Sequence, residues 1–151
     1  MKKSALFLVA LLCMALLSAS CFAGDKIIPV EQLPAAAQQF VKTNFPNAKI
    51  SFATKDAEFI GTKYEARLAD WTEINFDKKG EWDKVDCQMN SVPEALVPAA
   101  IVQYVKTNFD GTVITKIDKE RYGYDIELSN DLELKFNKKG QVMEVDDWRT
   151  I

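Results

Sequence analysis

Apolar residues recur at helical spacing in two stretches of the chain. The same set of intervals occurs at Leu33, Ala36, Ala37, Phe40 and Val41 and again at Val97, Ala100, Ile101, Tyr104 and Val105. One face of an α-helix has this spacing, and polar residues such as Gln38 and Lys42 fall on the other side. The pattern predicts two amphipathic helices, near 34–45 and 94–109, with Phe40 and Tyr104 as their central large residues.

Apolar and polar residues alternate along the chain after each predicted helix. Tyr64, Ala66 and Leu68 alternate with Glu65 and Arg67, and Tyr124, Ile126 and Leu128 alternate with Asp125 and Glu127. A period of two is typical of a β-strand with one buried face. In the first half of the chain, strands are expected near 50–53, 59–68, 71–76 and 81–87. DKKG at 77–80 and NKKG at 137–140 predict hairpin turns in which glycine adopts a positive φ.

These patterns belong to an internal repeat. VKTNF occurs at 41–45 and at 105–109, and DKKG at 77–80 returns as NKKG at 137–140. We therefore expect residues 24–151 to form one domain made of two repeats, 28–87 and 92–148. Several strands after a single helix indicate the α+β class. The predicted fold has two tandem helix-plus-four-strand repeats, which form an antiparallel sheet with the helices on one face.

Residues 1–23 have the pattern of a signal peptide. Two lysines precede an uncharged apolar stretch at 5–17, which is shorter than the about 20 residues that a membrane helix needs. A small-x-small cleavage site ends at Ala23. The alternative is a lipobox at 18–21, in which Cys21 becomes the lipidated first residue and anchors the protein. Both interpretations predict export, to the periplasm or the medium, with no transmembrane segment after cleavage.

The composition narrows the chemistry that the protein is expected to perform. The chain has 151 residues, a formal charge of −3 and no histidine, the commonest general base and zinc ligand. Cys87 is the one cysteine left after the preferred cleavage, so no intrachain disulfide or thiolate cluster is expected, and we interpret it as a strand residue. The chain has no basic run, which argues against nucleic acid as a partner. We expect neither catalysis nor a cofactor.

The repeated motifs carry a family resemblance. The segments LPAAAQQFVKTNFPNAKI, EINFDKKGEWDKVD and ELKFNKKGQVMEVD resemble the PepSY-like proteins that are grouped with the β-lactamase-inhibitor-protein fold. The resemblance covers essentially all of the chain after the predicted signal peptide. It implies a secreted or envelope protein of two tandem helix–sheet units, with an open sheet face that receives a partner protein. An inhibitor-like activity is one such function.

Strand parity assigns each side chain to one face of the predicted sheet, and a β-bulge reverses that assignment. The face under the helices is expected to take Tyr64, Ala66, Leu68, Ile74, Phe76, Val85, Tyr124, Ile126, Leu128, Leu132, Leu134, Phe136 and Val145. The helix-free face is expected to take the candidate partner-binding residues Arg67, Trp71, Glu73, Trp82, Lys84 and Trp148. Tryptophan and arginine are frequent anchors of protein interfaces. We predict that Trp71 and Trp82 lie near one another, with Arg67 and Lys84 beside them.

Three functions are compatible with these residues. We favour a non-catalytic secreted or periplasmic binding protein that docks a protein or peptide partner on its open sheet face. The first alternative is a small envelope enzyme that uses paired carboxylates such as Glu65 and Glu73. The second is a lipid-anchored structural protein of the cell surface. A metal-ion carrier is less favoured, because the loop at 77–80 is too short and too basic for a calcium site.

Overall fold

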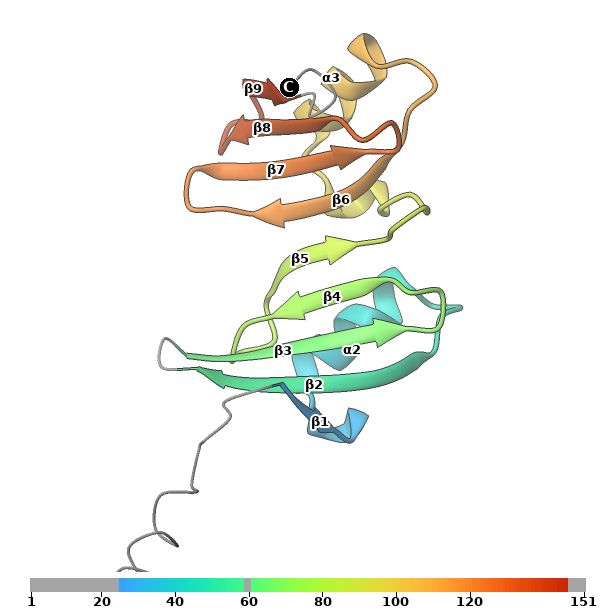
Figure 1. Cartoon of the computed structure of the whole chain (residues 1–151), viewed down its shortest axis with the longest axis vertical. Coiled ribbons are helices and arrows are strands. Elements are labelled where there is room, and N and C mark those ends of the chain that lie inside the picture. Colours follow the sequence, from blue (N-terminus) through green and yellow to red (C-terminus); the bar gives the residue numbers. More distant parts are fainter. Residues whose placement is uncertain (1–24, 59–60, 147–151) are drawn as a thin grey trace, which may run out of the picture.

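The computed structural model describes residues 25–58 and 61–146. The predicted signal peptide, the alternative lipobox and Trp148 lie outside these residues. The described chain forms one antiparallel sheet of nine strands, which follow one another in sequence order (Figure 1). The strands are β1 Lys26–Ile28, β2 Ile50–Glu58, β3 Gly61–Leu68, β4 Glu73–Phe76, β5 Trp82–Asp86, β6 Ile114–Lys119, β7 Gly123–Leu128, β8 Glu133–Asn137 and β9 Val142–Asp146.

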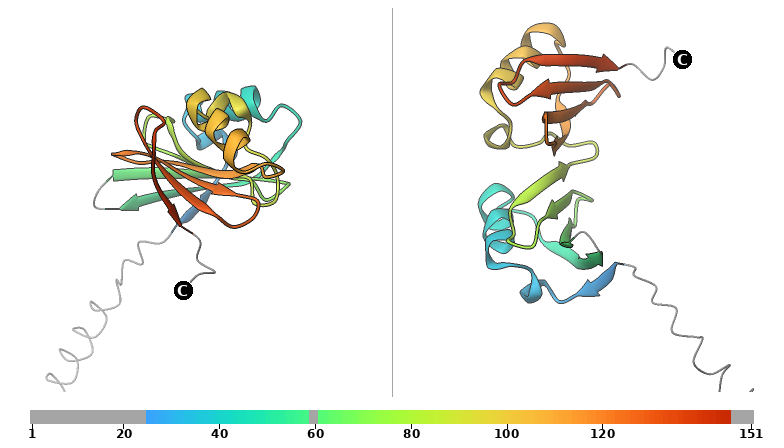
Figure 2. Two further views of the ribbon diagram at one scale, coloured as in Figure 1. Left: turned by 90° about the horizontal axis from the view of Figure 1, so that it is seen from above. Right: turned by 90° about the vertical axis from the view of Figure 1, so that its left-hand side faces the viewer.

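Two helices cover one face of this sheet and leave the other face free (Figure 2). They are α2, Ala35–Asn44, and α3, Ala99–Asn108. Each follows a short 3-10 turn, η1 at Val30–Gln32 or η2 at Glu94–Leu96. Each helix is followed by four antiparallel strands, so the predicted α+β fold is confirmed.

The second helix begins later than the sequence pattern indicates. We expected a helix from residue 94, but 94–96 form η2 and α3 starts only at Ala99. Val97 is extended, with φ −103° and ψ 131°, because a proline disfavours the helical conformation in the residue before it. Pro98 then occupies the N-cap position of α3, as Pro34 does in α2. The proline of each repeat therefore sets where its helix begins.

The helices contact the sheet through the predicted central aromatic residues. The Phe40 ring lies 5.7 Å from the Phe76 ring and the Tyr104 ring 5.4 Å from the Phe136 ring, both edge to face. The strand residues of these pairs, Phe76 and Phe136, are fully buried. Edge-to-face aromatic pairs are favourable beyond the area they bury. The two repeats are therefore packed by equivalent helix–strand pairs.

The KKG hairpins are shaped to fit under the start of each helix. Gly80 has φ +83°, and a Cβ atom there would lie 2.8 Å from the backbone nitrogen of Ala37. Gly140 has φ +74°, and its Cβ would lie 2.8 Å from the Cβ of Ala100. A side chain at either glycine meets both a conformational penalty and a clash. The repeated KKG motif therefore serves the fold.

Two strand pairings complete the sheet. β1, which the sequence analysis did not anticipate, is only three residues long, and its Ile28 pairs with Ala53 of β2. The repeats meet where β5 pairs with β6, with Val85 opposite Ile117. This junction joins the sheets of the two repeats into one.

Candidate functional site

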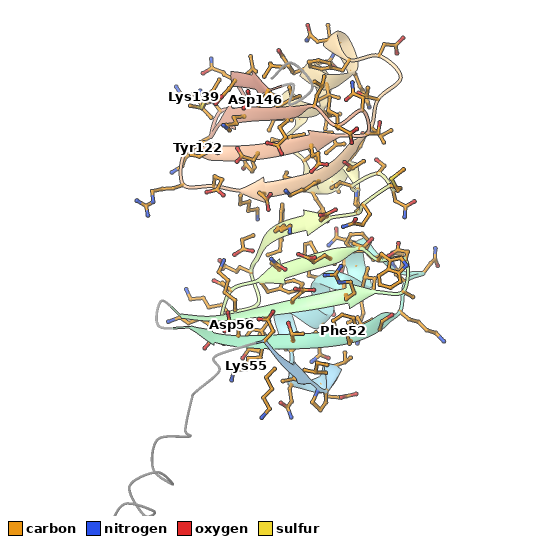
Figure 3. The ribbon with its side chains drawn as sticks, in the orientation of Figure 1. Phe52, Lys55, Asp56, Tyr122, Lys139 and Asp146 are labelled. Carbon is orange, nitrogen blue, oxygen red and sulfur yellow. The ribbon has the colours of Figure 1, made fainter. Side chains whose placement is uncertain are left out.

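The helix-free side of the sheet, called the open face below, carries two rows of cross-strand neighbours. One row runs from β2 to β9 through Phe52, Arg67, Glu73, Asp86, Lys116, Glu127, Glu133 and Asp146. The parallel row runs through Thr54, Glu65, Asn75, Lys84, Asp118, Asp125, Lys135 and Glu144. Figure 3 looks onto this face, with Phe52 on β2 and Asp146 on β9. Charged side chains therefore extend across both repeats.

In the first repeat, four charged residues of the open face form an ion-pair network, and Asp86 stands opposite one of them, Glu73. The Arg67 guanidinium lies 2.8 Å from Glu65 and 2.6 Å from Glu73, and the Lys84 ammonium lies 2.8 Å from Glu73. Burial raises the pKa of Glu73, but the contacts with Lys84 and Arg67 outweigh it, so that its net pKa lies below the ordinary value. Arg67, Glu73 and Lys84 thus lie on the open face, where strand parity predicted them.

This network bears on the carboxylate-pair hypothesis. Glu65 and Glu73 face the same cation, Arg67, which lies within ion-pair distance of both. A general acid needs a raised pKa, whereas the pKa of Glu73 is lowered. Glu65 and Glu73 therefore form an ion-pair network around Arg67, and the lowered pKa of Glu73 does not suit the role of a general acid.

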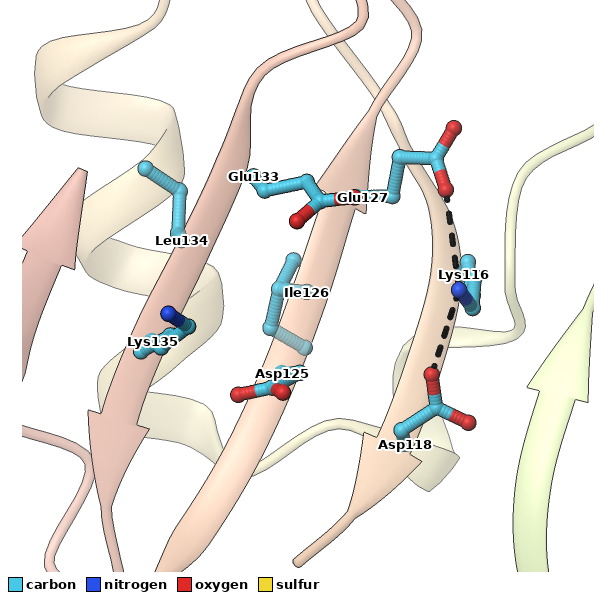
Figure 4. Close-up of a pocket in the computed structure, with 8 residues that line it drawn as sticks. All are labelled: Lys116, Asp118, Asp125, Ile126, Glu127, Glu133, Leu134 and Lys135. Atoms are coloured by element: carbon cyan, nitrogen blue, oxygen red, sulfur yellow. Dashed lines mark ion pairs between the residues drawn. The ribbon is translucent and has the colours of Figure 1, made fainter. Parts of the chain in front are cut away.

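In the second repeat, like charges oppose one another on the open face. Asp118 faces Asp125, and Glu127 faces Glu133. Lys116 lies 3.3 Å from Asp118 and 3.9 Å from Glu127 (Figure 4). A shallow hollow at this place is lined by Lys116, Asp118, Asp125, Ile126, Glu127, Glu133, Leu134 and Lys135.

The carboxylates around this hollow repel one another. Burial is the main cause that raises the pKa of Asp118; it outweighs the attraction of Lys116 and Lys84, and Asp125 adds a smaller contribution in the same direction as burial. Burial likewise raises the pKa of Glu127, with contributions from Asp86 and Glu133 in the same direction. Like charges directly opposite on neighbouring strands are destabilising. The second repeat therefore holds more negative charge here than its own cations neutralise.

The prediction that Trp82 lies on the helix-free face is wrong. A register shift between Asn75 and Phe76 places Trp82 opposite Phe76, whose side chain is in the core. The indole packs against Phe40 of α2, with ring centroids 5.9 Å apart, and the Lys119 ammonium lies 3.5 Å from its centroid. A β-bulge reverses the parity of the residues beyond it. Trp82 is thus part of the packing between helix, sheet and repeat junction.

The prediction that Trp71 neighbours Trp82 is also wrong. The register sets Glu73 opposite Asp86 and Phe76 opposite Trp82, so the two tryptophans lie toward opposite ends of the β4–β5 pair. Trp71 lies in the turn before β4, with φ 71° and 70% of its surface exposed. The third tryptophan, Trp148, lies outside the described residues. The predicted tryptophan cluster is therefore replaced by one exposed turn residue and one packed residue.

Two features limit the chemistry of the described residues. Cys87 is buried, and burial raises the pKa of its thiol to about 11, so it is a poor nucleophile. Residues 25–58 and 61–146 contain no group of three or more His, Cys, Asp or Glu residues that could hold a metal ion.

In the same residues, no helix has the length and apolar character needed to cross a membrane.

Val145 lies on the predicted face of the sheet but is more exposed than the other residues assigned to that face. It lies opposite Leu134, on the helix side of the sheet, as parity indicates. However, 48% of its surface is exposed, because β9 is the last strand of the sheet. The predicted face of Val145 is therefore correct, but the helix layer does not cover this edge of the sheet.

These features define a two-repeat α+β protein with one uncovered, charged sheet face. Residues 23–60 and 62–144 match the family model described as "Putative beta-lactamase-inhibitor-like, PepSY-like". The chain belongs to this PepSY-like family, which confirms the resemblance seen in its motifs. No curated protein matches the chain at a significant level.

Solved structures from two Bacteroides species are similar to this chain. One, from Bacteroides thetaiotaomicron, is described as a "putative calcium-regulated periplasmic protein"; it is 41% identical with a TM-score of 0.78, over 82% of this chain and 97% of that one. A Bacteroides vulgatus periplasmic protein of unknown function is 35% identical with a TM-score of 0.78, over 82% and 100%. A DUF2874-family periplasmic protein from the same species is 37% identical with a TM-score of 0.77, over 86% and 100%.

The comparisons bear on location and on function to different extents. All three structural relatives are described as periplasmic, which confirms the predicted export to the periplasm. Neither the family model nor these relatives indicate a catalytic activity.

Proposed function

We propose that the protein is a non-catalytic periplasmic binding protein, and that its open face docks a protein or peptide partner with a basic surface. The proposal rests on two cross-strand pairs of acids in the second repeat, in which Asp118 stands opposite Asp125 and Glu127 stands opposite Glu133. The open face is uncovered across β2 to β9, so a partner has access to both rows of side chains.

Charge complementarity selects the partner. Cations from a docked protein would offset the burial, and with it the like-charge repulsion, that raise the pKa of Asp118 and Glu127. Complementary charge also speeds encounter and suppresses wrong partners. A basic partner therefore gains more from the second repeat than from the first, where Arg67 and Lys84 already neutralise Glu73.

The first repeat supplies candidate contacts of a different kind. Arg67, Glu73 and Lys84 form a half-buried network that holds its side chains in fixed positions. Trp71 adds an exposed indole in the turn after β3. Ordered polar groups and an exposed aromatic residue suit a partner that extends across the face. We keep these four residues as candidate contact residues.

Calcium is the competing occupant of the acidic half. One structural relative is described as calcium-regulated, and calcium prefers carboxylate oxygens. The acids of the hollow, however, do not converge as a metal-holding group within the described residues. We therefore treat calcium as an alternative that the experiment must separate from a protein partner.

The test begins with a photo-crosslinking residue at Glu127 in the intact protein and, as the matched position, at Gln103 on the exposed side of α3. A partner protein that is crosslinked by the residue placed at Glu127, but not by the one placed at Gln103, is then purified. Its affinity is measured for the wild type, for Glu127→Gln/Glu133→Gln, and for Glu31→Gln/Glu94→Gln, which removes the same charge from the helix side.

We expect the open-face double variant to weaken binding about tenfold or more, and the helix-side double variant to change it less than about threefold. Equal losses in the two double variants would reject the proposal, because the effect would then be one of net charge. Calcium binding by the free protein that requires Glu127 and Glu133, with no partner captured from Glu127, would reject it in favour of a cation site.

A further inference from the structure

The last described strand of the sheet, β9, is the counterpart of β5 in the first repeat. β5 pairs with a further strand on its outer side, and β9, in the described part of the chain, does not. β5 and β9 have equivalent sequences, WDKVD and VMEVD, each two residues after KKG. Their registers also match, since Ile74 faces Val85 and Leu134 faces Val145, with a register shift at the same place in each. β5 is covered by β6 on its outer side, whereas β9 ends the sheet among the described residues.

All five residues of β9 are exposed, including Met143 at 59% and Val145 at 48%. At the β5–β6 junction the Cys87 N–H donates to the Thr115 carbonyl, which shows which backbone groups of that strand face outward. Because these groups alternate in direction along a strand, Val85 faces outward as well. By the repeat, the N–H and carbonyl of Val145 face the free edge of β9.

We propose that this free edge of β9 binds an extended segment of a partner protein by strand addition. Strand addition satisfies the backbone groups of an exposed edge and selects alternate side chains of the added segment. An edge strand that presents apolar side chains and no covering element is otherwise an aggregation hazard. The proposal goes beyond the docking face to the sheet edge, but it rests on the proposed function for the basic character of the partner.

The β5–β6 junction serves as the template for the added sequence. There, Asp86 faces Lys116, Val85 faces Ile117 and Lys84 faces Asp118. The corresponding residues of β9 are Asp146, Val145 and Glu144. Opposite charges across strands are favourable, and so are apolar pairs. An antiparallel segment with the order basic, apolar, basic therefore complements β9.

A second copy of this chain fits the edge less well. Antiparallel pairing of β9 with itself about Val145 would set Glu144 opposite Asp146, which are both acidic. Pairing with β1 of another copy would bring Ile27, which is 72% exposed, into the row of acids on the open face. Both arrangements lack the charge complementarity of the β5–β6 junction. The occupant is therefore a segment of another protein.

The probe is a fluorescein-labelled heptapeptide with Lys-Ile-Lys at its centre, added to the mature protein and followed by fluorescence anisotropy. The matched peptides carry Glu-Ile-Glu or Lys-Lys-Ile at the same place. A fourth peptide keeps Lys-Ile-Lys but has a methyl group on the isoleucine nitrogen, which removes one backbone donor without changing charge.

Two variants of the protein complete the design. Val145→Pro removes the outward N–H, and an edge strand tolerates proline when that group faces solvent. Val145→Thr is the control, because it keeps both the N–H and a β-branched side chain. Thermal unfolding of both variants shows whether the fold is kept. If Val145→Pro does not fold, the methylated peptide still tests the backbone contact.

We expect the Lys-Ile-Lys peptide to bind about tenfold more tightly than the other three peptides, and Val145→Pro to lose about tenfold while Val145→Thr loses less than about threefold. Unchanged binding by both the methylated peptide and Val145→Pro would overturn strand addition. If Glu127→Gln/Glu133→Gln alone abolished binding, the docking face would stand and the edge site would fail. Self-association that depends on Val145 would also overturn the assignment of a foreign segment.

Discussion

The two repeats carry the same sheet registers but different charges on the open face. Glu73 faces Asp86 in the first repeat as Glu133 faces Asp146 in the second. Arg67 lies against Glu73, whereas the neighbour of Glu133 in the row is Glu127. The backbone pairing is equivalent, so the side chains alone make the difference. The first repeat opposes one pair of acids and neutralises Glu73 with Arg67 and Lys84. The second repeat opposes acids at three places, which indicates that it is the half adapted to a cationic partner.

The two repeats also differ on the helix side of the sheet, where the aromatic packing is more extensive in the first repeat. Phe40 contacts both Phe76 and Trp82, whereas Tyr104 contacts Phe136 and Phe109. Val142 occupies the place of Trp82 in the second repeat, and it is 38% exposed. The first repeat therefore has the more extensive helix–sheet packing, which suits a structural role for that half.

The sharpest test of this asymmetry removes the central helix residues. Phe40→Ala and Tyr104→Ala are each expected to lower the free energy of unfolding by about 2–5 kcal/mol, because each leaves a cavity over a buried phenylalanine. Phe40→Ala should cost more, since it also removes the contact with Trp82. Urea unfolding followed by circular dichroism measures both. A larger loss for Tyr104→Ala would contradict the ranking of the repeats.

Replacing Trp82 by the residue that occupies its place in the second repeat tests the same point, with a smaller expected loss of stability. Trp82→Val installs the residue of the second repeat, and we expect it to destabilise the protein by about 2 kcal/mol through lost apolar contact. The cation–π contact with Lys119 at the repeat junction is lost as well. Val142→Ala is the matched control and should change stability by less than about 1 kcal/mol, because Val142 is partly exposed. Equal losses would show that the two positions contribute alike.

Much of the fold was predictable because it depends on local periodicity. The stripe around Phe40 and Tyr104 gave both helices, and alternation placed Ile74 and Leu134 correctly in the core. The start of α3 was missed because Pro98 interrupts an otherwise continuous apolar pattern. β1 was missed because three residues before a proline carry too little pattern to indicate a strand.

The candidate site was predicted only in part. Arg67, Glu73 and Lys84 all lie on the same side of the register shift between Asn75 and Phe76, so simple alternation was enough to place them. Trp82 lies beyond a bulge, which depends on how two strands pair and leaves no clear signal in either one. The meeting of the opposed acids Glu127 and Glu133 depends on the register between two strands, which alternation within one strand does not fix. The repeat itself, with Trp82 aligned to Val142, was the available warning against a tryptophan cluster.

The turns after β3 and β7 allow a smaller test. Trp71 and Asp131 occupy equivalent places and both have positive φ, 71° and 66°. Aspartate tolerates this conformation better than a bulky residue does. Trp71→Asp is therefore expected to raise the free energy of unfolding by about 1 kcal/mol, and Asp131→Trp to lower it by a similar amount. Chemical denaturation measures both, and a loss of stability in Trp71→Asp would show that the indole packs usefully in the free protein.

The smallest expected effect, the pH dependence of stability, tests the charge asymmetry most directly. The pKa of Glu73 is lowered, because its contacts with Lys84 and Arg67 outweigh burial, and that of Glu127 is raised by burial, Asp86 and Glu133 against the attraction of Lys116. A lowered carboxyl pKa stabilises the fold above the unfolded-state pKa, and this stability is lost as pH falls through the folded-state pKa. A raised carboxyl pKa has the opposite sign, because the folded state then binds the proton more tightly.

The two glutamates should therefore respond in opposite directions. Glu73→Gln is expected to be less stable than the wild type at neutral pH, with the difference vanishing at acid pH below the folded-state pKa of Glu73. Glu127→Gln is expected to be more stable at neutral pH, with the gain vanishing as pH falls below the unfolded-state pKa of about 4.3. Urea unfolding at a series of pH values measures both, and added salt should shrink both differences. If Glu127→Gln also lost stability at neutral pH, the acids of the second repeat would be satisfied within the protein, and the case for a basic partner there would fail.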